Sequence, residues 1–195
     1  MAAIGQERTV FVELEGVSAV GAVGAIEIHI KGDYARGWYE DAQGEAKKTD
    51  ARAKRREIVF AVCFVESYLL EWVRDSVAPG ILTELFPAKK ERPVAKRWKE
   101  VTADLVQRGR IKAAPDLSTQ IWQNFIKLLE YRKGLVHGVA SRPQITPSCG
   151  APEPVPTGAE IAAIENGWAV LVVSKLVRHL HAAAGDECPE WIEDV

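Results

Sequence analysis

The chain has 195 residues, 47% of them hydrophobic, and a formal net charge of −2, which indicates a globular domain rather than a disordered or strongly basic protein. Its three widely spaced cysteines match no disulfide framework or metal pattern, and no run of about 18 apolar residues predicts a membrane span. The N-terminus does not read as a secretory signal, so we expect a cytoplasmic, single-domain protein (1–195) with no membrane association.

The N-terminal region is expected to be a small β appendage. Segments 9–15 and 25–31 are short, β-branched and partly alternating, which predicts the two strands of an antiparallel β-hairpin. The glycine-rich stretch between them lacks the Gly-x-Gly-x-x-Gly spacing of a dinucleotide site, so no cofactor is expected. Residues 33–44 contain Gly37 and Gly44 and are expected to form a loop, so that 1–45 precedes the main fold.

The rest of the chain shows helical periodicity. Apolar residues at three- and four-residue steps predict substantial helices over 50–77, 95–107, 117–137 and about 158–184. The five prolines of 141–158 predict an irregular surface loop, and 186–195 is an acidic tail. We therefore expect a mainly α fold, an antiparallel helical bundle over 50–184 that follows a short N-terminal β-hairpin.

The end of the third predicted helix carries an Arg-x4-His spacing, from Arg132 to His137. Arginine offers a permanent charge and a rigid fork of donors, while histidine can exchange a proton near neutral pH. RNA supplies its own nucleophile in the 2′-hydroxyl, so these two side chains suit cleavage of a phosphodiester without a metal. Glu66 lies among apolar residues of the first long helix and needs a buried partner, for which Arg132 is the natural candidate.

This arrangement resembles the HEPN superfamily, compact helical domains whose Arg-x4-6-His motif lies toward the end of a late core helix. The resemblance covers roughly 50–184 and implies a metal-independent endoribonuclease with Arg132 and His137 as catalytic residues and Glu66 as a supporting residue. Many active members place a small polar residue directly after the arginine. This chain has Lys133 at that position, which is expected to support the site by contacting phosphate. Lysine cannot accept a hydrogen bond, so the positioning role of the small polar residue is not carried over.

Five residues along an ideal helix correspond to roughly 140° of rotation and 7.5 Å of rise, so Arg132 and His137 do not share one helix face. The family often resolves this by dimerisation, which brings two motifs into one cleft, and a homodimer is therefore part of the hypothesis. RNA-binding contacts are expected from Lys96 and Arg97, within the basic stretch 89–112. No metal site is expected, and no function is assigned to His29, His179 or His181.

The leading hypothesis is a HEPN-like endoribonuclease, of the toxin or antiphage defence type, with an antitoxin or a nucleotidyltransferase as a potential partner. The alternative is a noncatalytic HEPN-like module for dimerisation or for binding a protein or nucleotide. In that case His137 contacts the last carbonyls of its helix and Arg132 pairs with a buried carboxylate.

Overall fold

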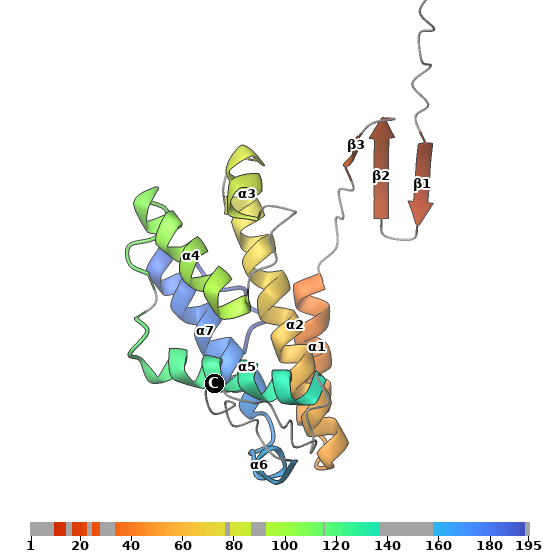
Figure 1. Ribbon diagram of the computed structural model, residues 1–195, viewed down its shortest axis with the longest axis vertical. Coiled ribbons are helices and arrows are strands. Elements are labelled where there is room, and N and C mark those ends of the chain that lie inside the picture. The colour runs from red at the N-terminus through yellow and green to blue at the C-terminus, as the bar shows by residue number, and fades with distance from the viewer. Residues whose placement is uncertain are drawn as a thin grey trace, which may run out of the picture. The chain divides into compact units, whose positions relative to one another are not determined.

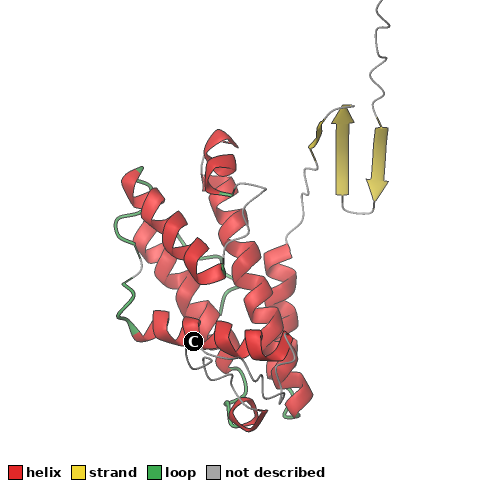
Figure 2. Ribbon diagram, in the orientation of Figure 1, coloured by secondary structure: helices red, strands yellow, loops and turns green. Residues whose placement is uncertain are grey.

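The computed structural model describes residues 10–14, 17–22, 25–27, 34–76, 79–86, 93–114, 116–136 and 158–193. The chain divides into two compact units, Met1–Tyr34 and Ala35–Val195, and each is described by itself. The described chain is mainly helical (Figures 1 and 2).

The first unit contains a three-stranded antiparallel sheet with the order β1-β2-β3. The strands are β1 (Val10–Leu14), β2 (Val17–Ala22) and β3 (Ala25–Glu27). In the register, Val10 is opposite Gly21 and Val20 is opposite Glu27.

The predicted pairing of 9–15 with 25–31 is wrong, because β2 lies between these segments in the order of the sheet. The glycines of this stretch favour a loop over a strand. The β-branched Val17 and Val20 favour a strand, and the short connections after β1 and β2 allow neighbouring strands to pair.

The second unit begins with α1 (Tyr34–Ala46), which covers the stretch that was predicted to be a loop. Ala35, Tyr39 and Ala42 are buried and recur at steps of four and three, so this helix has a narrow apolar stripe. Gly37 and Gly44 favour a loop in the sequence pattern, and this signal is stronger than that of the narrow apolar stripe. A Cβ added at Gly37 or Gly44 would meet nothing within 4 Å, so neither position is a required break.

The remaining helices largely follow the predicted pattern. They are α2 (Ala51–Ser76), α3 (Pro79–Leu85), α4 (Val94–Gln107), α5 (Gln120–Val136), α6 (Gly158–Ala162) and α7 (Trp168–Ala184). The last predicted helix is in fact two, because the chain turns at Gly167, whose φ is 80°. The predicted proline-rich loop, apart from Gly158, lies outside the described residues.

Asp50 immediately precedes α2, the longest of the described helices, and caps its N-terminus. Its Oδ1 atom accepts the backbone N–H groups of Arg52 at 2.8 Å and Ala53 at 2.9 Å. A carboxylate at this position satisfies two donors of the first turn and offsets the basic residues that follow it. Farther along, Lys54 donates to the carbonyls of Ala162 and Ile164, which ties the end of α6 to α2.

Helices α2 and α7 are parallel neighbours, so the expectation of an antiparallel bundle is wrong for this pair. Glu57, near the start of α2, contacts Ala169 at the start of α7, and Tyr68 contacts His181, about three turns farther along both helices. In Figure 1, α5 lies across the other helices. Short loops make neighbouring helices antiparallel. The chain between α2 and α7 is long and contains helices α3 to α6, so α7 can begin beside the start of α2 and run in the same direction.

The core of the second unit is rich in aromatic side chains from distant segments. Tyr39, Phe64 and Tyr68 each contact Trp191 edge to face, with ring centroids 5.7–6.1 Å apart. Ile192 is 1% exposed, so the stretch expected to be an acidic tail is anchored by Trp191 and Ile192. On the other side, Trp98 of α4 contacts Phe125 of α5 and donates from Nε1 to the Val65 carbonyl of α2 at 3.2 Å. Among the described helices, none has the length and apolar character needed to cross a bilayer.

Candidate functional site

The Arg-x4-His motif lies at the end of α5. Arg132 and Lys133 belong to the last two turns of this helix, whose final residue is Val136. His137 is the next residue and lies outside the described residues. The structure therefore places one of the two predicted catalytic residues.

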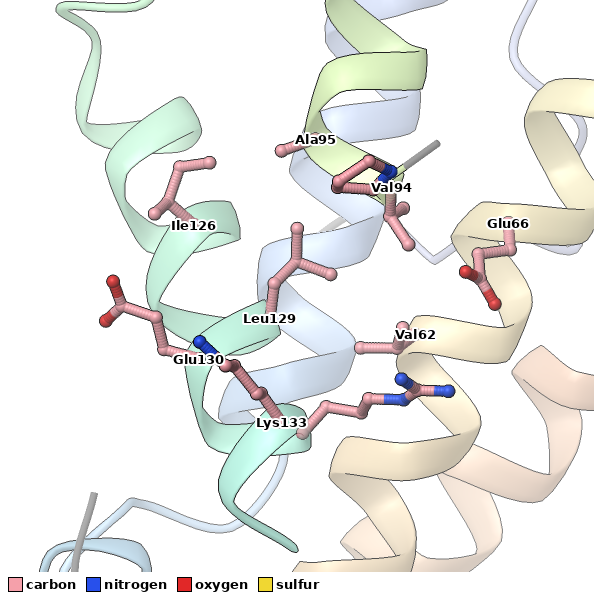
Figure 3. A pocket seen from close by; sticks show the side chains of 10 residues that line it. Val62, Glu66, Val94, Ala95, Ile126, Leu129, Glu130 and Lys133 are labelled. Carbon is pink, nitrogen blue, oxygen red and sulfur yellow. The ribbon is translucent and has the colours of Figure 1, made fainter. Parts of the chain in front are cut away.

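Arg132 lines an open pocket of about 550 Å³ between α2, α4 and α5. Figure 3 shows this pocket from close by. Its lining residues come from all three helices: Val62, Glu66, Pro93, Val94, Ala95, Ile126, Leu129, Glu130, Arg132 and Lys133. Three of the predicted site residues, Glu66, Arg132 and Lys133, thus share one pocket although they come from two helices.

The guanidinium of Arg132 is only partly satisfied. Its Nε atom is buried and has no hydrogen-bond partner among the described residues. A buried N–H without an acceptor is uncommon in folded proteins and costs about 1–3 kcal/mol. Nε itself is covered by the protein, so an anion in the pocket would accept hydrogen bonds from the terminal N–H groups of the guanidinium instead.

Glu66 faces the same pocket from α2 (Figure 3). The expected ion pair with Arg132 is not among the ion pairs of the described residues; the two side chains share a pocket instead. Both charges act on the thiol of Cys63. Burial raises the pKa of Cys63, Glu66 raises it further, and Arg132 lowers it. The sequence therefore predicted the neighbourhood of Glu66 and Arg132 correctly, but not their direct pairing.

The N-terminus of α4 forms another wall of the pocket, through Pro93, Val94 and Ala95. The N-cap residue is Pro93, which makes no side-chain capping hydrogen bond. The first N–H groups of a helix carry partial positive charge, so this wall also favours an anion. The sequence predicts Lys96 and Arg97 of this helix as RNA-binding residues, but it does not indicate that the first residues of the helix line the pocket of Arg132.

The two predicted RNA-binding residues follow directly on this wall. Lys96 is exposed and lies 3.7 Å from Glu100, one turn along α4. Arg97 is partly buried. Part of the surrounding basic stretch is neutralised within the protein, because Arg108 pairs with Asp104 and Glu84. This part of the basic stretch is therefore less available to a polyanion.

A polar cluster, buried at Tyr68 and His181 and exposed at Asp186, joins α2 to the C-terminal segment, and sequence reasoning missed it. His181 Nε2 hydrogen-bonds to the hydroxyl of Tyr68, and His181 Nδ1 lies 2.7 Å from Asp186 Oδ1. Trp72 Nε1 donates to the other carboxylate oxygen of Asp186 at 3.2 Å. No function is assigned to His181 from the sequence, because its partners come from other segments of the chain.

The direction of these hydrogen bonds follows from the donors available. Asp186 as a carboxylate can only accept, so Nδ1 of His181 donates to it and, in the neutral imidazole, Nε2 accepts from Tyr68. Burial, followed by the nearby Cys188, Asp186 and Glu71, raises the pKa of Tyr68 far above its ordinary value. Tyr68 therefore keeps its proton. With His181 only 4% exposed, we assign this cluster to structure.

Within the described ranges, no group of three or more His, Cys, Asp or Glu side chains is placed to hold a metal ion. Comparisons of the chain with protein families, with curated proteins and with solved structures give no match.

Proposed function

We propose that the protein is a HEPN-like endoribonuclease that cleaves RNA without a metal, at the pocket lined by Glu66, Arg132 and Lys133. The observation that carries this proposal is the side chain of Arg132, which borders an open pocket and whose buried Nε has no hydrogen-bond partner among the described residues. Lys133 and the N-terminus of α4 add positive potential on the same pocket. A phosphodiester oxygen is the acceptor that these groups suit.

In the proposed reaction, His137 removes the proton of the RNA 2′-hydroxyl, and the 2′-oxygen attacks the adjacent phosphorus. Arg132 stabilises the charge that accumulates on the non-bridging oxygens. The bond to the 5′-oxygen breaks and that oxygen takes a proton, which leaves a 2′,3′-cyclic phosphate and a 5′-hydroxyl. Proton transfer by a positioned side chain typically contributes about 10²- to 10⁴-fold to the rate.

The rest of the proposal concerns the assembly. A homodimer would bring two copies of the motif into a shared cleft, so that the histidine of one chain acts beside the arginine of the other. Lys96 and Arg97 would contact RNA phosphates that extend beyond the pocket. A role as a toxin or antiphage component in the cytoplasm, with an antitoxin or nucleotidyltransferase partner, is the biological setting that we propose.

The test uses purified protein and total RNA in EDTA. We expect cleavage by the wild type and at least a hundredfold loss in both Arg132→Ala and His137→Ala, with folded content matched by circular dichroism. Lys127→Ala is the control, because this exposed lysine lies on α5 but does not line the pocket. Unchanged cleavage in either motif variant would sink the proposed site.

A second candidate, a noncatalytic HEPN-like nucleotide-binding module, is favoured by the walls of the pocket. Val62, Val94 and Leu129 give it a largely apolar lining, which suits retention of a ligand. For this candidate, the wild type binds nucleotides but leaves RNA intact, and Arg132→Ala weakens binding. The homodimer of the first candidate has a separate test: a molar mass in solution that stays that of a monomer at all protein concentrations would rule out the shared cleft.

A further inference from the structure

We propose that the pocket between α2, α4 and α5 accepts a guanine base, and that Glu66 reads the Watson–Crick edge of that base. This inference rests on the proposed function, because it takes the ligand of the pocket to be RNA. The site would then recognise one base in addition to the phosphate.

The apolar walls suit a flat ring. Val62 of α2, Val94 of α4 and Leu129 of α5 bring aliphatic side chains to the pocket from three helices (Figure 3). The volume of about 550 Å³ falls in the roughly 300–1,000 Å³ range of small-molecule sites. A phosphate group alone would leave these walls in contact with water, whereas a nucleobase would cover them.

The charges of the pocket also exclude a simple anion site. Arg132 and Lys133 are opposed by Glu66 and Glu130, so the lining has two positive and two negative side chains. A ligand that interacts favourably with both the positive and the negative side chains has an anionic end and a hydrogen-bond-donating end. A nucleotide meets this requirement, because its phosphate is anionic and its base carries N–H donors.

Of the two carboxylates, Glu66 is the one placed to meet the base. Figure 3 shows its carboxylate directed into the space between α2 and α5, whereas the carboxylate of Glu130 lies toward the outer side of α5. Glu130 is exposed, while Glu66 is partly buried. A carboxylate that is shielded from water discriminates more strongly between ligands than one that is fully hydrated.

The hydrogen-bonding pattern of an ionised carboxylate selects among the four bases. Its two oxygens only accept, and guanine alone offers two adjacent donors, N1–H and the N2 amino group, for a bidentate pair. Adenine and cytosine place a ring nitrogen acceptor beside their amino group, and uracil flanks its single N–H with two carbonyls. A bidentate contact discriminates against the wrong base by roughly tenfold to a hundredfold.

The experiment uses isothermal titration calorimetry to measure binding of the four nucleoside 3′-monophosphates, which contain no phosphodiester bond to cleave. We expect the guanosine nucleotide to bind at least tenfold more tightly than the other three. Glu66→Gln should remove most of that preference while binding of the adenosine nucleotide changes little. The matched control is Glu130→Gln, which also neutralises a pocket carboxylate and should keep the preference.

A ligand-side comparison avoids dependence on any variant. Inosine 3′-monophosphate lacks only the N2 amino group, so it should bind the wild type several-fold more weakly than the guanosine nucleotide. Equal binding of the guanosine and inosine nucleotides, or of all four standard nucleotides, overturns the proposal. A guanine preference that survives Glu66→Gln also overturns it.

These outcomes are separable from those of the ribonuclease test. Selective, Glu66-dependent binding of the guanosine nucleotide without RNA cleavage supports the base pocket and rejects the enzyme. Cleavage that depends on Arg132 and His137 but occurs equally beside all four bases supports the enzyme and rejects the base pocket.

Discussion

Glu57 caps α7 from another helix. Its Oε1 atom accepts the backbone N–H of Ala169 at 2.9 Å and of Val170 at 3.3 Å, and Oε2 accepts that of Gly167 at 3.3 Å. The N-cap residue of α7 is Gly167, which has no side chain to satisfy these donors. Glu57 is only 3% exposed, so this carboxylate joins the start of α2 to the start of α7 inside the protein.

Glu57→Ala is expected to lower the free energy of unfolding by about 2 kcal/mol, because it leaves buried N–H groups of α7 without an acceptor. Glu57→Gln keeps one acceptor oxygen and should cost less. Urea denaturation followed by circular dichroism measures both. A loss below about 0.5 kcal/mol in the alanine variant would show that this cap contributes little.

Glu57 should also give the stability a particular pH dependence. Burial raises the pKa of its carboxyl above the ordinary 4.5, against the opposing effect of the three N–H donors. A carboxyl whose pKa is higher in the folded state contributes most below pH 4.5, and this contribution is lost as pH rises through the folded pKa.

The stability of the wild type relative to Glu57→Gln should therefore increase as pH falls from neutrality to about 4.5. Thermal or urea unfolding of the two proteins across that window measures this difference. A difference that shrinks on acidification would show that the hydrogen bonds to α7 outweigh burial.

Tyr68→Phe removes the donor that faces His181 Nε2 and leaves that buried nitrogen unpaired. We expect the free energy of unfolding to fall by about 1–3 kcal/mol. Tyr39→Phe is the matched comparison, because the Tyr39 hydroxyl lies 2.8 Å from Ser174 Oγ, which also donates to the Val170 carbonyl. The Tyr39 hydroxyl also accepts the backbone N–H of Glu193 at 3.2 Å, so its loss should cost a similar amount although Ser174 keeps a hydrogen bond.

Substitutions of two glycines by alanine should act in opposite directions. Gly37 lies in α1 with open space around its Cβ position, so Gly37→Ala should stabilise the protein by about 0.5–1 kcal/mol. Gly167 has a φ of 80°, so Gly167→Ala should destabilise it by about 1–2 kcal/mol. Gly167→Asn should be milder than Gly167→Ala, because asparagine tolerates this conformation better. Chemical denaturation of the three variants measures these effects; stabilisation by Gly167→Ala would contradict the assignment.

Periodicity predicted most of the helical content correctly. Helix α2 repeats apolar residues such as Ile58, Val62 and Leu69 over seven turns, and a pattern of that length is difficult to misread. The short stripe of α1 was outweighed by its glycines. The break before α7 depends on the conformation of Gly167, which sequence alone does not determine.

The residues of the candidate site could be predicted where the pattern of a single helix indicates them, and less well where the site depends on how three helices pack together. Glu66 was recognised because a carboxylate on an apolar face needs an explanation, and it does border the pocket of Arg132. The wall formed by the N-terminus of α4 depends on how that helix is placed against α5. The partners of His181 come from Tyr68 on α2 and Asp186 beyond α7, and no local spacing predicts them.

The parallel packing of α2 and α7 has a consequence for synthesis on the ribosome. Glu57 and Tyr68 meet partners that lie 112 and 113 residues farther along the chain. Until α7 and Trp191 have emerged, the aromatic side of α2 is covered only by α1, through the contact of Tyr39 with Phe64. The nascent chain therefore lacks the native partners of Tyr68 for most of translation, and loop closure over this distance slows the final step of folding.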